Sequence, residues 1–176
     1  MIRRIASTLL SSGADCVIIV TGHMGETIER NVSDLGVVCI KNPDYEKTQM
    51  LDSVKLGLHY LMDKCDRVLF TPVDIPLFSK ETVLSLLESG GKLACPHKNG
   101  KDGHPILIDS EFIPEILTYS GPKGLRGAVK SLNQPMTRIN TEDSGAFLDA
   151  DTPEDFEKLI ELVECPSNSA AIRASL

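Results

Sequence analysis

The chain has 176 residues, of which 41% are hydrophobic and 24% charged, and these proportions are typical of a single globular α/β domain. No apolar run approaches the ~20 residues that span a bilayer, and the net charge of −7 argues against non-specific nucleic-acid binding. The five cysteines are scattered without metal-binding spacing, so we expect buried free thiols and a reducing cytoplasm.

Helices and strands alternate through the first half of the chain. This alternation predicts a parallel sheet with right-handed crossovers and helices on both faces. Apolar residues at helical spacing predict the helices, and short runs of Val, Ile and Leu predict the strands. In chain order, we predict a helix that ends near Gly13, a strand over 17–20, a helix over 26–31, a strand over 37–40, a helix over 50–61 and a strand over 67–71.

The sequence pattern of the second half of the chain predicts antiparallel strands mixed with helices. Ser79 is a helix N-cap, Gly90 ends that helix, and strands over 93–95 and 105–108 flank a polar loop as an antiparallel pair. The other predicted elements are helices over 111–118 and 125–132, strands over 136–139 and 146–148, and a helix from Thr152 whose buried stripe is Phe156, Leu159, Ile160 and Val163. We therefore predict one domain over residues 1–164 and a weakly ordered tail over 165–176.

Carboxylates follow two of the predicted strands, at the sheet edge where α/β folds bind ligands. Asp74 lies between Pro72 and Pro76, which stiffen its loop, and a rigid Asp beside phosphates suits Mg²⁺. Asp149 and Asp151 are two apart in an extended segment, so their side chains point the same way and could share a cation. The alternatives are an ordinary turn residue at Asp74 and a residue that only assists the last helix cap at Asp151.

Two other segments carry candidate binding residues. His104, between Gly103 and Pro105, lies at the mouth of the antiparallel pair, and we expect it in the cleft and partly exposed. The alternative is a hydrogen-bonded structural histidine. The glycine-rich segment 121–127 offers backbone N–H donors and Arg126 to an anionic group, or else forms a plain loop.

The ordered set of these motifs resembles a known family. Over about residues 1–163, the chain is similar to the MobA-like nucleotidyltransferases, and most closely to their molybdenum cofactor cytidylyltransferase branch. The segments that carry this resemblance are 17–23, 42–45, 49–54, 71–76, 103–105 and 149–155.

The resemblance implies a three-layer α/β/α Rossmann-like fold, with a mostly parallel sheet and a small antiparallel part. It also implies transfer of a nucleoside monophosphate from an NTP, CTP in preference to GTP, to a phosphorylated pterin (molybdopterin), with Mg²⁺ and with release of pyrophosphate. Neither a nucleic acid nor a membrane is an expected partner.

The same resemblance assigns roles to individual positions. Asp74 and Asp151 would be catalytic and hold the metal, with Asp149 beside them. The residues that would line the nucleotide pocket are Thr21, Gly22, His23, Asn42, Ser53 and Pro72, and those that would face the acceptor are Gly103, His104, Pro105 and Arg126.

The chain departs from the family pattern at two places. The family's first strand and glycine-rich phosphate loop, with its Arg and Lys, have no counterpart before Met1, and Pro122 stands where the family commonly has Asp. Because that strand is central in the family, we expect a gap between the strands at 17–20 and 67–71. An upstream segment, a different closure of the sheet or a partner would fill it, and we expect the chain alone to be inactive.

Two other functions remain open from the sequence. A sugar-phosphate nucleotidyltransferase would share the fold and the metal-binding Asp but use a different acceptor. A degenerate domain would bind a nucleotide or a partner without turnover, which the missing phosphate loop favours.

Overall fold

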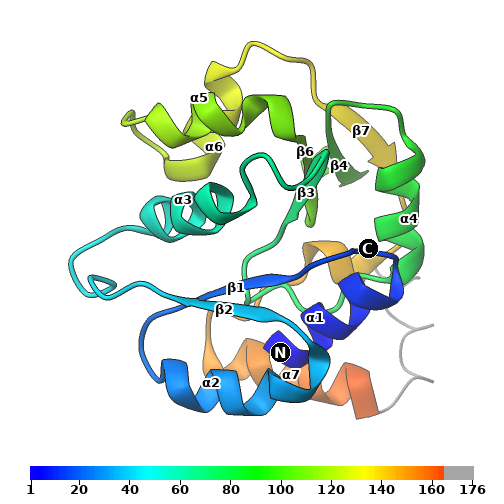
Figure 1. Cartoon of the computed structure of the whole chain (residues 1–176). Helices are drawn as coiled ribbons and strands as arrows, with labels where there is room; N and C mark the ends of the chain where they lie inside the picture. The colour runs from blue at the N-terminus through cyan, green and yellow to red at the C-terminus, as the bar shows by residue number, and fades with distance from the viewer. Residues whose placement is uncertain (165–176) are drawn as a thin grey trace.

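The computed structural model describes residues 1–164, and its strands form two separate sheets (Figure 1). The first half contains α1 (Ile2–Ser11), β1 (Ile18–Thr21), α2 (Gly25–Val32), η1 (Ser33–Leu35), β2 (Val38–Lys41), α3 (Met50–Leu61), β3 (Arg67–Phe70) and α4 (Lys80–Glu88). The second half contains β4 (Leu93–Lys98), β5 (Lys101–Asp102), β6 (Ile106–Asp109), η2 (Ser110–Phe112), α5 (Ile113–Thr118), α6 (Gly124–Ser131), β7 (Thr137–Asn140), η3 (Ser144–Phe147) and α7 (Pro153–Glu164).

The strand pairing places β1 and β3 in different sheets. β1 pairs with β2 in parallel, while β3 lies at the edge of a sheet ordered β3-β6-β4-β5, in which β7 also pairs with β4. The α/β fold class and the antiparallel β4–β6 pair are confirmed. Among the strands of the described residues, parallel pairing is limited to β1–β2 and β4–β7, because β3 takes the antiparallel β6 as its neighbour instead of β1. The placement of β1 and β3 in different sheets agrees with the gap expected between them.

The larger sheet is the middle layer of the fold, as the alternation of its side chains indicates. Val68 of β3 packs in a cluster with α3, α5 and α6, whereas the next residue, Leu69, packs with α1 and α4 on the other side. β6 repeats the pattern, because Ile108 faces the first cluster and Leu107 packs against α4. Figure 1 shows α3, α5 and α6 on one face of this sheet and α4 on the other.

Leu69 also connects the two sheets through side chains. It packs against the cluster that contains Val17 and Ile19, beside and within β1, although no strand pairing joins β1 to β3. The two sheets therefore share a hydrophobic core without sharing a hydrogen-bond ladder.

Asp143 fastens the start of α4 to η3. Its Oδ2 accepts hydrogen bonds from the Ser79 backbone N–H at 2.7 Å and the Thr82 hydroxyl at 2.6 Å, and its Oδ1 accepts from the Gly145 N–H at 3.0 Å. Because the Gly145 bond closes a turn, the predicted strand over 146–148 is wrong, and η3 forms there instead. The carbonyl of Ala146 in η3 then accepts the backbone N–H of His104 at 2.9 Å.

We predict that Asp143→Ala lowers the free energy of unfolding by about 2–3 kcal/mol, because it leaves several partly buried donors without their charged acceptor. Urea denaturation followed by circular dichroism measures the change. Asp15→Ala, at an exposed position in the turn after α1, is the matched control. Equal midpoints for the two variants would show that the Asp143 contacts add nothing to stability.

A second network joins the strands that lead to His104. Asp102 of β5 accepts two hydrogen bonds from Arg138 of β7, at 2.8 and 3.2 Å, and its Oδ1 lies 2.8 Å from Nδ1 of His97 in β4. Arg138 contributes most to lowering the pKa of Asp102, with His97 acting in the same direction and burial opposing both.

This lowered pKa predicts an acid-dependent contribution to stability. An Asp whose folded pKa lies below its unfolded value of about 3.9 stabilises the fold above that pH, and the contribution is lost as the pH falls through the folded pKa. We therefore expect Asp102→Asn to be less stable than the parent chain at pH 7, with the difference shrinking below about pH 4. Thermal denaturation between pH 7 and pH 3 measures this, and a constant difference would contradict it.

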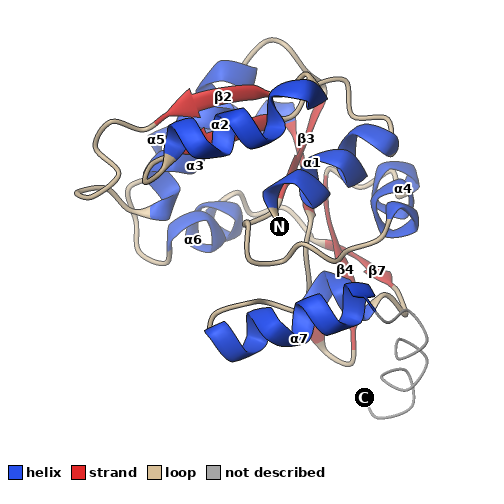
Figure 2. Cartoon of the chain, turned by 90° about the horizontal axis from the view of Figure 1, so that it is seen from below, coloured by secondary structure: helices blue, strands red, loops and turns tan. Residues whose placement is uncertain are grey.

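Three side chains of α7 that the sequence predicted to be buried are exposed in the structure. Of the predicted stripe on α7, only Leu159 is buried (5% exposed), while Phe156, Ile160 and Val163 are 41%, 40% and 48% exposed. The helix lies along the outside of the molecule, apart from α3, α5 and α6 (Figure 2). Helical spacing determines which face is apolar, but not whether other elements cover it.

The cysteines also differ from expectation. Within the described residues the thiols are free, but Cys95 alone is buried, Cys39 and Cys65 are half-buried, and Cys16 is exposed. Burial raises the pKa of the Cys95 thiol to about 12. Cys165 and the predicted tail over 165–176 lie outside the described residues. No helix in the described part of the chain is both long and apolar enough to cross a membrane.

Candidate functional site

Within residues 1–164, two buried side-chain atoms without hydrogen-bond partners mark the candidate site. They are Oδ1 of Asp74, in the loop after β3, and Nδ1 of His104, in the loop before β6. Leaving a buried polar atom unpaired costs about 1–3 kcal/mol, so such atoms in a native fold require an explanation. Both belong to segments that the sequence singled out.

The His104 ring is held in place by β3 and η3. Its backbone N–H donates to Ala146, and its ring stands edge-on to Phe70 with 6.0 Å between centroids. Burial lowers the pKa of His104, and this effect is opposed by a hydrogen bond to the Phe70 backbone and by the negative charge of Asp74. His104 is thus half-buried and lies near enough to Asp74 for that carboxylate's charge to act on it.

Close packing explains the glycine before this histidine. A Cβ at Gly103 would lie 2.6 Å from the Ala146 carbonyl oxygen and 2.6 Å from the Phe147 ring. Gly103 and Pro105 are both buried, so they shape the loop that presents His104 rather than offering side chains to a ligand.

The backbone brings Asp149 and Asp151 to the Asp74 loop. The N–H of Ala150, between the two acids, donates to the carbonyl of Asp74 at 3.0 Å. Both acids are exposed, and they lie in a loop rather than in the extended strand that the sequence predicted. Residues 1–164 contain no cluster of three or more His, Cys, Asp or Glu side chains placed to hold a metal, so Asp74, Asp149 and Asp151 do not form a three-ligand set in this structure.

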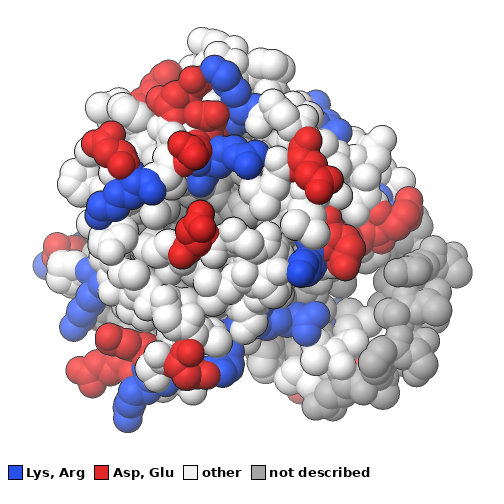
Figure 3. Space-filling view, turned by 45° about the vertical axis from the view of Figure 1, so that its right-hand side comes forward, with Lys and Arg blue, Asp and Glu red and all other residues white. Residues whose placement is uncertain are grey.

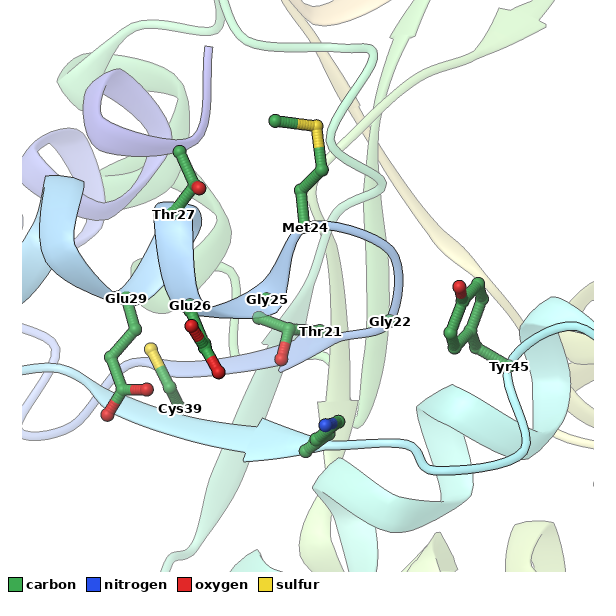
Figure 4. A pocket seen from close by; sticks show the side chains of 10 residues that line it. Thr21, Gly22, Met24, Gly25, Glu26, Thr27, Glu29, Cys39 and Tyr45 are labelled. Carbon is green, nitrogen blue, oxygen red and sulfur yellow. The ribbon is translucent and has the colours of Figure 1, made fainter.

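A pocket of about 380 Å³ lies beside the ends of β1 and β2, at the start of α2 (Figure 4). Thr21 and Gly22, both expected to bind nucleotide, line it. Gly22 lies against Tyr45, because a Cβ there would come within 2.6 Å of the Tyr45 ring. The other lining residues are Met24, Gly25, Glu26, Thr27, Glu29, Cys39 and Lys41.

His23 is exposed and does not line this pocket, but its ring centroid lies 6.3 Å from that of Tyr45. Sequence reasoning gave no site role to Tyr45 or Lys41. No local pattern pairs Gly22 with Tyr45, since they lie in loops after different strands. Both residues follow neighbouring parallel strands, so they lie at the same edge of the sheet. That shared position is the sequence feature from which the contact could have been predicted.

Asn42 is turned inward instead of toward a ligand. It is only 3% exposed, and its Nδ2 donates to the hydroxyls of Thr48 at 2.9 Å and Ser53 at 3.1 Å, while its Oδ1 accepts the Asp44 N–H at 3.0 Å. Both donors of the amide and its oxygen are therefore engaged in joining the loop after β2 to the first turn of α3. Asn42 and Ser53 position this loop in the structure, and Pro72 is half-buried in the loop before Asp74.

The glycine-rich segment 121–127 is tightly packed on itself. The Tyr119 hydroxyl donates to the Pro122 carbonyl at 2.9 Å, and a Cβ at Gly127 would collide with that same oxygen. Arg126 is exposed on α6. Figure 3 shows basic and acidic side chains interspersed on the face it presents, without a patch of one sign.

Comparisons with known proteins agree with this architecture. The family model for the MobA-like NTP transferase domain matches residues 1–136, and no curated protein matches the chain. A nucleotidyl transferase structure from Methanothermobacter thermautotrophicus superposes with a TM-score of 0.75 at 18% identity, over 90% of this chain and 77% of that chain.

Two other solved structures show the same fold. Rv0371c of Mycobacterium tuberculosis H37Rv, in complex with manganese, has a TM-score of 0.74 at 18% identity, over 90% of this chain and 84% of that chain. The 2-C-methyl-D-erythritol 4-phosphate cytidylyltransferase of Thermus thermophilus has a TM-score of 0.68 at 16% identity, over 91% of this chain and 89% of that chain.

Proposed function

The chain belongs to the MobA-like NTP transferase domain family, and we propose that its nucleotidyltransferase reaction moves CMP from CTP to a phosphorylated pterin, molybdopterin, with release of pyrophosphate. The observation that carries this proposal is the buried, unpartnered Oδ1 of Asp74 at the sheet edge where ligands bind. A carboxylate oxygen left without a donor is suited to a cation beside phosphates.

One unpartnered carboxylate, that of Asp74, fits a divalent metal such as Mg²⁺, which binds through one or two carboxylates together with substrate phosphates. Asp74 would hold it, with Asp151 and Asp149 reaching the same edge from either side of Ala150. When bound, the metal offsets negative charge on the nucleotide phosphates. The Ala150 hydrogen bond and the two flanking prolines keep the Asp74 loop in place, so its carboxylate needs little reorganisation during the reaction. The manganese complex of Rv0371c supports a divalent metal in this fold.

The remaining groups divide into a nucleotide side and an acceptor side. The pocket bordered by Thr21, Gly22 and Tyr45 would take the nucleotide, with Asn42 and Ser53 holding its loop in shape. The segment Gly103–Pro105 would face the acceptor, with Arg126 as a further contact. The acceptor phosphate attacks the α-phosphorus, forming a new P–O bond as the bond to pyrophosphate breaks. That phosphate is already anionic near neutral pH, so no general base is required.

A sugar- or polyol-phosphate acceptor is the second candidate. Its support is the similarity to the Thermus cytidylyltransferase, which is named for 2-C-methyl-D-erythritol 4-phosphate. Both candidates use CTP and differ only in the acceptor. A non-catalytic nucleotide-binding domain is the third possibility.

We also propose that an added strand completes the sheet between β1 and β3. In the part of the chain that the structure describes, each of these strands is paired on one side only, β1 with β2 and β3 with β6, and their side chains already share a core. An extended segment of this protein or of a partner would satisfy both edges. In the family pattern, this strand leads into the glycine-rich phosphate loop.

Pyrophosphate release tests the function. The chain is assayed alone and with a family-type strand and glycine-rich loop added before Met1. Each form is offered CTP or GTP with molybdopterin, with 2-C-methyl-D-erythritol 4-phosphate, or with no acceptor. We expect turnover by the extended form with CTP and molybdopterin. Turnover with the polyol phosphate alone would favour the second candidate, and tight Mg-CTP binding without turnover would favour the third.

A further inference from the structure

The unpartnered atoms of Asp74 and His104 both present lone pairs. The imidazole of His104 is hydrogen-bonded to the Phe70 backbone, and its Nδ1 has no partner, so the nitrogen that contacts Phe70 is Nε2. The proton therefore lies on Nε2, where it donates to the carbonyl of Phe70, and Nδ1 is left as an acceptor. Oδ1 of Asp74 is also an acceptor, so the two atoms cannot satisfy each other.

This arrangement matches the surroundings of a metal-binding histidine. In such sites the ring nitrogen that does not bind the metal donates to a backbone carbonyl or a carboxylate, which selects the tautomer and orients the ring. Phe70 provides that partner for His104, and its edge-on ring contact further restricts the imidazole. The Ala146 carbonyl and the packing at Gly103 hold the backbone of the same loop. The ring is thus oriented before any ligand arrives.

We propose that His104 Nδ1 is a direct ligand of the metal held by Asp74, and that this nitrogen makes the site favour Mn²⁺ over Mg²⁺. Mg²⁺ prefers oxygen ligands, whereas imidazole suits transition metals, and Mn²⁺ accepts nitrogen together with carboxylate and water oxygens. The inference rests on the metal site of the proposed function. It adds a metal-binding role to His104, whose segment faces the acceptor in the proposed function.

Electron spin echo spectroscopy of bound Mn²⁺ tests the nitrogen ligand directly. The full chain is loaded with Mn²⁺ alone, without nucleotide or acceptor. We expect a ¹⁴N modulation from a coordinated imidazole. The modulation should disappear in His104→Gln and persist in His59→Gln, whose histidine is exposed on α3. Bound Mn²⁺ without ¹⁴N modulation in the parent chain would overturn the inference, whatever the variants do, and so would an absence of Mn²⁺ binding into the millimolar range.

Affinity measurements test the selectivity. We expect His104→Gln to weaken Mn²⁺ binding by at least about 10-fold, because losing a direct ligand costs no less than losing a group that supports one. Mg²⁺ binding should change by much less. Equal losses for both metals would overturn the selectivity. Circular dichroism shows whether the variant is folded, and His104→Asn provides a smaller replacement if it is not.

The outcomes separate this inference from the proposed function. A nitrogen-bound Mn²⁺ in a protein that transfers no nucleotide would support the ligand and refute the reaction. Nucleotidyl transfer with oxygen-only coordination would support the reaction and refute the ligand.

Discussion

We expect purified residues 1–176 to give no detectable cytidylyl transfer and to bind Mg-CTP weakly, and we expect the form extended by a strand and glycine-rich loop to gain both activities. This is the largest effect we expect. β1 and β3 lie in separate sheets, so the central ladder is interrupted beside the Asp74 loop. An NTP also brings several negative charges to this edge. Removing one preorganised donor costs about 10²–10³ in rate, and the phosphate loop supplies several donors together.

Pyrophosphate release and calorimetric titration with Mg-CTP measure the two forms in parallel. An extension of equal length without the glycines, Arg and Lys of the loop is the control, because it completes the strand but offers no phosphate contacts. We expect it to stabilise the fold without restoring turnover. Robust transfer by the unextended chain would contradict the prediction and show that another part of the molecule holds the triphosphate.

The second large effect concerns Asp74. In the extended form, Asp74→Asn should lower the rate of transfer by about 10²–10³-fold, because the amide removes the negative charge that faces the metal while keeping the size of the side chain. Asp151→Asn should lower the rate in the same direction but by less, since its side chain is exposed. The free energy of unfolding should not fall in Asp74→Asn, since the carboxylate oxygen Oδ1 has no partner to lose.

Asp63→Asn is the matched control for these variants. Asp63 is exposed after α3 and has a positive φ of 62°, a conformation that Asn also tolerates. Transfer assays at saturating Mg-CTP, with urea denaturation of the same preparations, separate catalysis from folding. An Asp74→Asn protein that retains its rate, or that loses stability in proportion to its rate, would remove Asp74 from the proposed metal site.

Local features of this fold could be predicted from the sequence because they depend on neighbouring residues. Helical spacing located α3 over Met50–Leu61, and the cap at Ser79 is confirmed by its hydroxyl, which accepts the Thr82 N–H at 3.2 Å. The Thr152 cap is confirmed in the same way, by a bond from the Asp155 N–H at 3.2 Å. Prolines on both sides of Asp74 marked a stiff loop at the ligand edge of the sheet.

Long-range packing decided the features that the sequence could not. Nothing near Asn42 indicates that Thr48 and Ser53 use its amide, and nothing near Phe156 indicates that the apolar face of α7 stays exposed. The meeting of Asp74 with His104 depends on β6 lying beside β3, a pairing between strands far apart in the chain. Periodicity and caps are properties of a few consecutive residues, and they determined the elements of this protein. Burial, strand partners and the convergence of side chains depend on which elements touch, and only the tertiary structure settled them.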